Sequence, residues 1–199
     1  MNFRDELFSL HNKTEHNLKI VEGFTNEFAV PILNEWRYGS RHIANSLTLD
    51  LAEEEQTKAL GHWRRAYYDS CDIVLNCQLE RLSEYHCRWR GYTDVVKEVI
   101  PEYTKHLSDI RCIQKIHEEA KCSVLGSDRQ QAYDSLQPSI DALSKILDEI
   151  EANKDAVDCS IRRARTKHWG GIIIAVTAII SILPQAAKAL ISCIQGLMK

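Results

Sequence analysis

The stretch that decides the fold reads PSIDALSKILDEIEANKDAVDCSIRRARTKH and covers residues 138–168. Mostly apolar residues recur along it in alternating steps of three and four, which predicts a long helix with one seam. The seam runs through four heptads and consists of Ile140, Leu143, Leu147, Ile150, Lys154, Val157, Ile161, Ala164 and His168. It fits either one helix of a bundle or a stalk that associates with other copies of the chain. The charge of Lys154 weakens the stalk interpretation.

The residues before this stretch also follow helical patterns. Eight glycines and four prolines in 199 residues leave room for long, uninterrupted helices. No segment has a clear strand pattern, so we expect an all-α fold. Apolar spacing and helix-breaking residues predict a first helix at about 4–28 and a second at 32–47. A third helix begins at a capping box at 50–53 and ends at Gly91, and a fourth covers 92–124 with an interruption at Pro101. A further capping box at 127–130 begins the next helical stretch.

The charge is distributed unevenly along the chain. The net charge is -3, but six lysines and arginines and no acid follow residue 158, so residues 1–158 carry -9 and the remainder +6. An acidic body with a basic C-terminal part argues against nucleic-acid binding and favours an anionic membrane as a neighbour. The first residues contain no apolar core of a signal peptide, and the seven cysteines form no disulfide framework. We therefore expect a body on the cytosolic side of a membrane.

The segment WGGIIIAVTAIISILPQAA, residues 169–187, is 19 residues long and uncharged. As a helix it would span about 28 Å, against about 30 Å for the hydrocarbon core of a bilayer. The positive-inside rule then predicts a single pass with the N-terminal body in the cytoplasm. The alternative is a buried core helix, which Pro184 and Gln185 favour. The predicted membrane interface consists of Arg162, Arg163, Arg165, Lys167 and Trp169.

A polar stripe follows one face of this C-terminal part. Such a stripe is unfavourable against lipid unless its groups are paired. Three arrangements would satisfy it: a pore formed with other copies, hydrogen bonds between packed helices, or a tail that bends at Pro184 and lies in the interface. Gly171, Ala175 and Ala178 form a ridge of small residues that suits close helix packing. The stripe consists of Thr177, Ser181, Gln185, Lys188, Ser192, Gln195 and Lys199.

Catalytic patterns are weak in this sequence. Arg81-Leu-Ser-Glu-Tyr-His86 resembles the Arg-x4-6-His motif of HEPN ribonucleases, in which both side chains act on a phosphodiester. That resemblance makes Arg81 and His86 candidate catalytic residues. However, His86 falls on the apolar face of its predicted helix, where a core histidine is the commoner outcome. No metal-binding spacing and no phosphate-binding loop occurs, so we expect a non-enzymatic protein without metal or cofactor.

Together these patterns predict an elongated helical-bundle or coiled-coil body followed by a C-terminal transmembrane helix. The predicted divisions are a cytosolic bundle (1–137), a heptad-patterned helix (138–168) and a membrane segment (169–199) with a span of about 169–187 and an amphipathic tail at 188–199. This layout resembles membrane-acting effectors of bacterial defence and cell-death systems, which implies oligomerisation and membrane permeabilisation. The alternative is a tail-anchored scaffold that binds a partner protein through its bundle. Membrane lipids and further copies of the chain are the expected partners.

Overall fold

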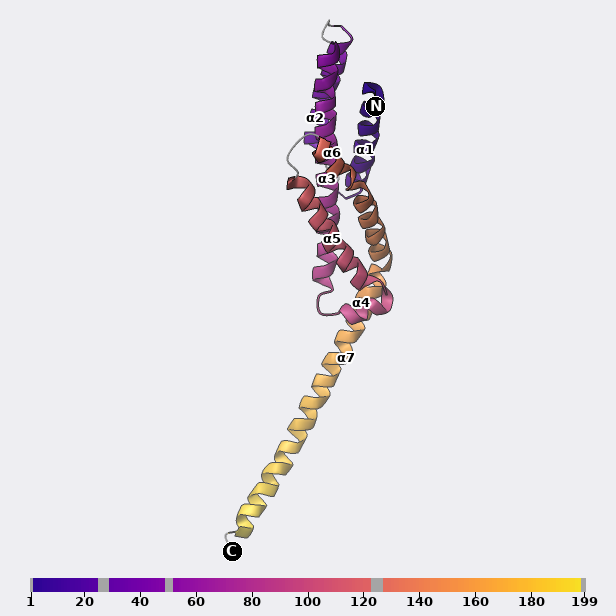
Figure 1. The fold of residues 1–199 in the computed structure, drawn as a ribbon. Helices are drawn as coiled ribbons and strands as arrows, with labels where there is room; N and C mark the ends of the chain where they lie inside the picture. Colours follow the sequence, from indigo (N-terminus) through magenta and orange to yellow (C-terminus); the bar gives the residue numbers. More distant parts are fainter. Residues whose placement is uncertain (1, 25–28, 49–51, 123–126, 198–199) are drawn as a thin grey trace.

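The computed structural model describes the backbone of residues 2–24, 29–48, 52–122 and 127–197, and their side chains except at 127–128, 168–171, 176 and 179–197. Every regular element in these ranges is an α-helix, which confirms the all-α prediction (Figure 1). The helices are α1 (Phe3–Phe24), α2 (Val30–Ser46), α3 (Ala52–Arg88), α4 (Thr93–Val99), α5 (Tyr103–Cys122), α6 (Ser127–Asp134) and α7 (Gln137–Leu197).

The long helix α3 is the spine of an elongated bundle. Helices α1 and α2 lie along its N-terminal part, α5 and the beginning of α7 lie along its C-terminal part, and α4 packs against α7 and α5 (Figure 1). Buried polar contacts fix both halves, because Asn17 Nδ2 donates to Ser70 Oγ at 3.0 Å and Gln78 Nε2 donates to Ser144 Oγ at 2.8 Å. The core is therefore a strip along α3 rather than a sphere.

The heptad seam of α7 packs inside this bundle. Its apolar members from Ile140 to Ile161 are buried, with exposed fractions of at most 8%. They belong to the same core cluster as Tyr67, Leu75 and Trp89 of the α3 region. The seam thus contacts helices of its own chain, as the bundle interpretation predicts, and these residues leave no apolar stripe open for a stalk.

The helix-breaking residues Pro31, Gly91 and Pro101 lie at helix ends, as the sequence predicts. Pro31 lies in the first turn of α2, where a missing backbone N–H costs no helical hydrogen bond. Gly91 has φ of 85°, a left-handed conformation that favours glycine, and it follows the end of α3. Pro101 separates α4 from α5. The predicted end of the first helix at 28 and the capping side chains at 50 and 127 lie outside the described residues.

Two helical glycines make a matched test of this packing. A Cβ on Gly39 would lie 2.9 Å from Trp63 Nε1, whereas a Cβ on Gly61 would meet only Arg65 Nη1 at 3.9 Å. Alanine gains about 1 kcal/mol over glycine in a helix, but overpacking a core costs about 1–3 kcal/mol. We expect Gly61→Ala to raise the free energy of unfolding in urea by about 0.5–1 kcal/mol. Gly39→Ala should lower it, and equal stabilisation by both would contradict the close approach of α2 to Trp63.

Candidate functional site

The point where α7 leaves the bundle is held by a small polar cluster. Asp158 accepts a hydrogen bond from Trp89 Nε1 at 3.0 Å and pairs with Arg88 Nη2 at 2.6 Å. About two turns after Asp158 on α7, Arg165 Nε donates to the Tyr92 hydroxyl at 3.4 Å. These contacts join the end of α3 and the start of α4 to α7, so they fix the direction in which α7 leaves the bundle.

A basic collar surrounds α7 at this exit. We use this term for Arg162, Arg163, Arg165 and Lys167, all of which are exposed. Beyond them α7 continues as one helix through Pro184 to Leu197 and projects away from the other helices (Figure 1). Trp169, the fifth predicted interface residue, has its side chain outside the described set.

The projecting part of α7 exposes large apolar side chains. Ile172, Ile173 and Ile174 are 39%, 62% and 72% exposed. Because neighbouring residues on a helix point about 100° apart, three consecutive isoleucines present apolar surface around most of the circumference. Three exposed isoleucines in a row form an apolar patch outside the bundle, of the kind that marks a contact with another molecule or with a membrane.

The polar stripe is described at one position. Thr177 is exposed, and its hydroxyl donates to the carbonyl oxygen of Ile173 at 2.8 Å, which satisfies the hydroxyl within the helix. Ala175 and Ala178 of the small-residue ridge are exposed. The side chains of Gly171, Ser181, Gln185, Lys188 and Ser192, named as ridge or pore-lining residues, lie outside the described set.

In the part of the chain that the structure describes, no helix is both long and apolar enough to cross a membrane. The predicted span includes residues outside that part, namely the side chains at 169–171, 176 and 179–187. The transmembrane helix therefore stays a prediction.

The two candidate ribonuclease residues have different neighbours. Arg81 donates to Glu151 at 3.2 Å and to Glu84 at 3.1 Å, and these ion pairs neutralise its charge. His86 is exposed, not on the apolar face as the sequence predicts, and its Nδ1 lies 3.4 Å from the Tyr103 hydroxyl. Its neighbour Tyr85 is the buried residue at this turn. The assignment of Arg81 and His86 as catalytic residues stays a prediction.

Sequence reasoning missed a set of histidine–carboxylate pairs that join different helices. His117 is 1% exposed, and its Nε2 lies 2.8 Å from Asp72 Oδ1 on α3. Partners so far apart in sequence leave no local signal that could have predicted them. The other pairs are His42–Glu55, His62–Glu35, His106–Glu149 and His16–Asp141. Among the described residues no cluster of three or more histidine, cysteine or acidic side chains is arranged to hold a metal ion.

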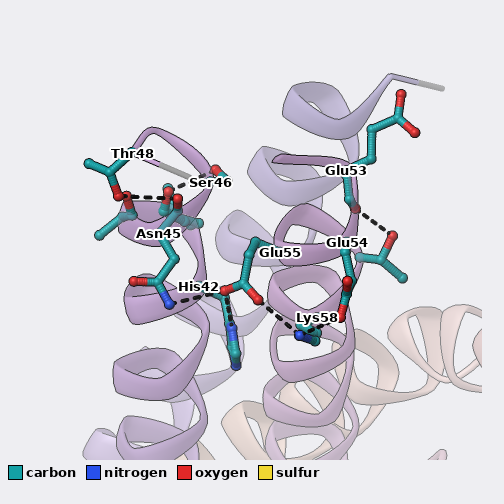
Figure 2. A network of polar contacts seen from close by, with 11 residues as sticks. His42, Asn45, Ser46, Thr48, Glu53, Glu54, Glu55 and Lys58 are labelled. Carbon is teal, nitrogen blue, oxygen red and sulfur yellow. Dashed lines mark hydrogen bonds and ion pairs between the residues drawn. The ribbon is translucent and has the colours of Figure 1, made fainter. Parts of the chain in front are cut away.

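The densest of these polar networks joins α2 to α3 (Figure 2). Glu55 is buried and accepts from His42 Nδ1 at 2.8 Å, Asn45 Nδ2 at 3.0 Å and Lys58 Nζ at 2.9 Å. The hydrogen bonds from His42, Lys58 and Asn45 outweigh the effect of burial and lower the pKa of Glu55 from 4.5 to about 2. The carboxylate is therefore a structural tie between two helices.

A lowered pKa predicts an acid-dependent loss of stability. The folded state holds Glu55 ionised, so its contribution to stability is complete above pH 4.5 and is lost as pH falls from 4.5 to about 2. We expect the stability difference between the wild type and Glu55→Gln to shrink over that interval. Carbon-13 NMR titration of the Glu55 carboxyl group should give a midpoint near 2, and a midpoint near 4.5 would contradict the network.

Comparison with models of protein families, with curated proteins and with solved structures finds no match to this chain.

Proposed function

We propose that this chain is a membrane-anchored helical effector: its bundle lies on the cytosolic side, and the projecting part of α7 inserts into the bilayer. The observation that carries the proposal is the row of exposed isoleucines, Ile172–Ile174, directly after the basic collar. Transfer of their exposed surface into hydrocarbon is worth about 3–5 kcal/mol. The collar would contribute about 1 kcal/mol per cation near anionic lipid headgroups.

The continuity of α7 supports a mechanical link between bundle and membrane. One helix contains both the buried seam that ends near Ile161 and the isoleucine row. A helix without a break transmits rotation or displacement from one end to the other, so a change in bundle packing would reorient the inserted part. The cluster around Asp158 is the place where the bundle sets that orientation.

Permeabilisation is the part of the proposal that rests on the polar stripe. In an oligomer the stripe would face neighbouring copies or a water-filled path, which avoids the cost of polar groups against lipid. Gln185 and Lys188 would carry the leak, because they are the most polar members of the stripe in the span and directly after it.

The test is expression of the full chain in cells stained with a membrane-potential dye. We expect the wild type to depolarise the membrane and Gln185→Leu with Lys188→Leu to remove that effect. The matched control is Gln114→Leu with Lys115→Leu on the exposed face of α5, which should depolarise as the wild type does. Unchanged depolarisation by the Gln185/Lys188 variant would remove the stripe from the mechanism.

A tail-anchored scaffold is the second candidate. Exposed large apolar side chains on the bundle favour it, because they offer contact surface to a partner protein: Phe8 is 65% and Val30 is 58% exposed. Replacement of residues 169–199 by an unrelated membrane anchor separates the two candidates. A scaffold would keep its function, whereas an effector that acts through α7 would lose it.

A further inference from the structure

Two members of the basic collar, Arg162 and Arg165, lie on one side of α7. They are three residues apart, a spacing that places their Cβ atoms about 5–6 Å from one another on a helix. The other two members, Arg163 and Lys167, lie at least about 100° around the helix from this pair, since successive residues are rotated by about 100°. All four side chains are exposed, so the collar has two separate cationic sides.

Contacts within the protein hold both arginines of the pair by the same atom. Arg165 Nε donates to the Tyr92 hydroxyl at 3.4 Å, and its guanidinium lies over the Tyr92 ring, 5.9 Å from the ring centroid. Arg162 Nε donates to the carbonyl oxygen of Asp158 at 3.4 Å. Among the described residues neither side chain uses its terminal nitrogens, Nη1 and Nη2, in a hydrogen bond. Four terminal nitrogens therefore remain available to a ligand.

No carboxylate of the described residues compensates the charge of this pair. Asp158 is the last acid in the chain, and it is already paired with Arg88 Nη2 at 2.6 Å and hydrogen-bonded to Trp89 Nε1. Neither Arg162 nor Arg165 takes part in an ion pair with the residues that the structure describes. An anion that contacts both would reduce the repulsion between two neighbouring positive charges.

The pair lies at the depth of lipid headgroups if α7 inserts as proposed. Arg165 precedes the predicted start of the span at residue 169 by four residues, which is about 6 Å along the helix axis. The headgroup layer on each side of a bilayer is about 5–8 Å thick. Arg165 is therefore within this layer, and Arg162, about one turn further out, reaches the layer through its side chain.

The number of charges and donors indicates which phosphate fits this pair. Arginine binds phosphate through two parallel N–H donors, and two arginines offer two such forks and two positive charges. A phosphate monoester carries about 1.5–2 negative charges at pH 7 and three free oxygens, whereas a diester carries one charge and has two free oxygens. The monoester matches both the charge and the donors of Arg162 and Arg165 more closely.

We propose that Arg162 and Arg165 bind the terminal phosphate of a phospholipid whose headgroup is a phosphate monoester. Tyr92 is a positioning residue, because it holds Arg165 by Nε and leaves the terminal nitrogens directed to the ligand. This inference rests on the proposed function, since it requires α7 to enter the bilayer. It adds a preference for one headgroup to a collar that would otherwise attract any anionic surface.

The test uses the full-length chain in phosphatidylcholine nanodiscs, titrated with short-chain phospholipids. Proton–nitrogen NMR of the arginine Nε–H groups reports on the contact, and single Arg162→Gln and Arg165→Gln variants assign the two signals. We expect dihexanoyl phosphatidic acid to bind about tenfold more tightly than dihexanoyl phosphatidylglycerol, which is a diester. Glycerol 3-phosphate has the same terminal phosphate without acyl chains. Equal affinity for it would assign the site to a soluble phosphate and overturn the lipid proposal.

Two double variants separate this site from the net charge of the collar. Arg162→Gln with Arg165→Gln should remove the preference for phosphatidic acid. The matched control Arg163→Gln with Lys167→Gln removes the same charge from the other side of the helix and should keep the preference. Loss of the preference in both, or in neither, would contradict a site formed by Arg162 and Arg165.

A conservative variant and a positioning variant test the geometry of the site. Arg165→Lys keeps the charge but loses the fork, so it should lose most of the preference for phosphatidic acid. Tyr92→Phe should weaken binding of phosphatidic acid about threefold and leave binding of phosphatidylglycerol unchanged. A chain that does not enter nanodiscs would overturn both this inference and the membrane proposal, whereas entry without a preference for phosphatidic acid would overturn this inference alone.

Discussion

Replacement of Ile174 and Ala178 by aspartate should release the full-length protein from membranes. Both residues are exposed on the projecting part of α7, one turn apart, and Ala178 is at the centre of the predicted span. An aspartate at the middle of a membrane helix costs about 2.5–3.5 kcal/mol, so the pair opposes insertion by up to about 5–7 kcal/mol. That cost offsets most of the favourable free energy expected from the isoleucines and the basic collar together, and fractionation should find much more of the variant than of the wild type in the supernatant.

A matched control uses the same helix and the same spacing. Ala152 and Ala156 are exposed on the part of α7 that packs in the bundle. Their double replacement by aspartate adds the same charge to a surface that faces water, so this variant should remain in the membrane fraction. If both double variants fractionated alike, the isoleucine row would have no role in membrane association.

Replacement of Trp89 by alanine should be the most destabilising single change at the exit of α7. Trp89 is 1% exposed, and its ring lies 5.3 Å from the ring of Tyr85 and 6.0 Å from that of Tyr103. Removal of a buried tryptophan leaves a large cavity and typically costs about 3–5 kcal/mol. Urea unfolding followed by near-ultraviolet circular dichroism measures the loss.

Trp89→Phe separates packing from hydrogen bonding. Phenylalanine keeps much of the ring but cannot donate to Asp158. Because most of the packing is preserved, we expect the free energy of unfolding to fall by only about 1–2 kcal/mol. The basic collar should also become more accessible to trypsin in Trp89→Ala, because α7 loses its fixed direction at the exit. Equal stability of the alanine variant and the wild type would show that this cluster does not hold α7.

Most of the fold follows from patterns of short range in the sequence. The seam from Ile140 to Ile161 and the breakers Pro31, Gly91 and Pro101 predicted helices that the structure contains. What the pattern could not decide was whether the seam faced its own chain or another copy, because a heptad repeat specifies an apolar stripe and not its partner. The buried seam shows that the partner is the body of the same chain.

Contacts between residues that are far apart in the sequence account for the features that sequence patterns did not predict. Asn17 and Thr14 are buried on a face of α1 that apolar spacing alone would assign to Leu18 and its neighbours. Asn17 is tolerated there because Ser70 and Cys71 accept its amide hydrogens. Likewise His86 is exposed and Tyr85 buried, because small shifts of the apolar face accumulate along a helix of 37 residues.

The packing around Trp63 shows the same limit. Arg4, Leu7 and His11 share a face of α1, and this much is readable from their spacing. The approach of Trp36 and Trp63 depends on how α2 packs on α3, and Gly39 permits that packing. In sequence, the mixed aromatic and basic segment around Trp63 looks like core rings with exposed arginines, and in the structure Trp63 is 7% exposed whereas Arg65 is exposed.

Alkaline carbonate extraction of membranes from cells that express the full-length chain with a C-terminal tag tests the central claim most directly. If hydrocarbon surrounds α7 beyond the basic collar, the protein remains in the pellet, and protease added from the cytosolic side digests the bundle but leaves the tag intact. Recovery of the untreated chain as a monomer in the supernatant, without detergent, would contradict the claim that α7 enters the bilayer.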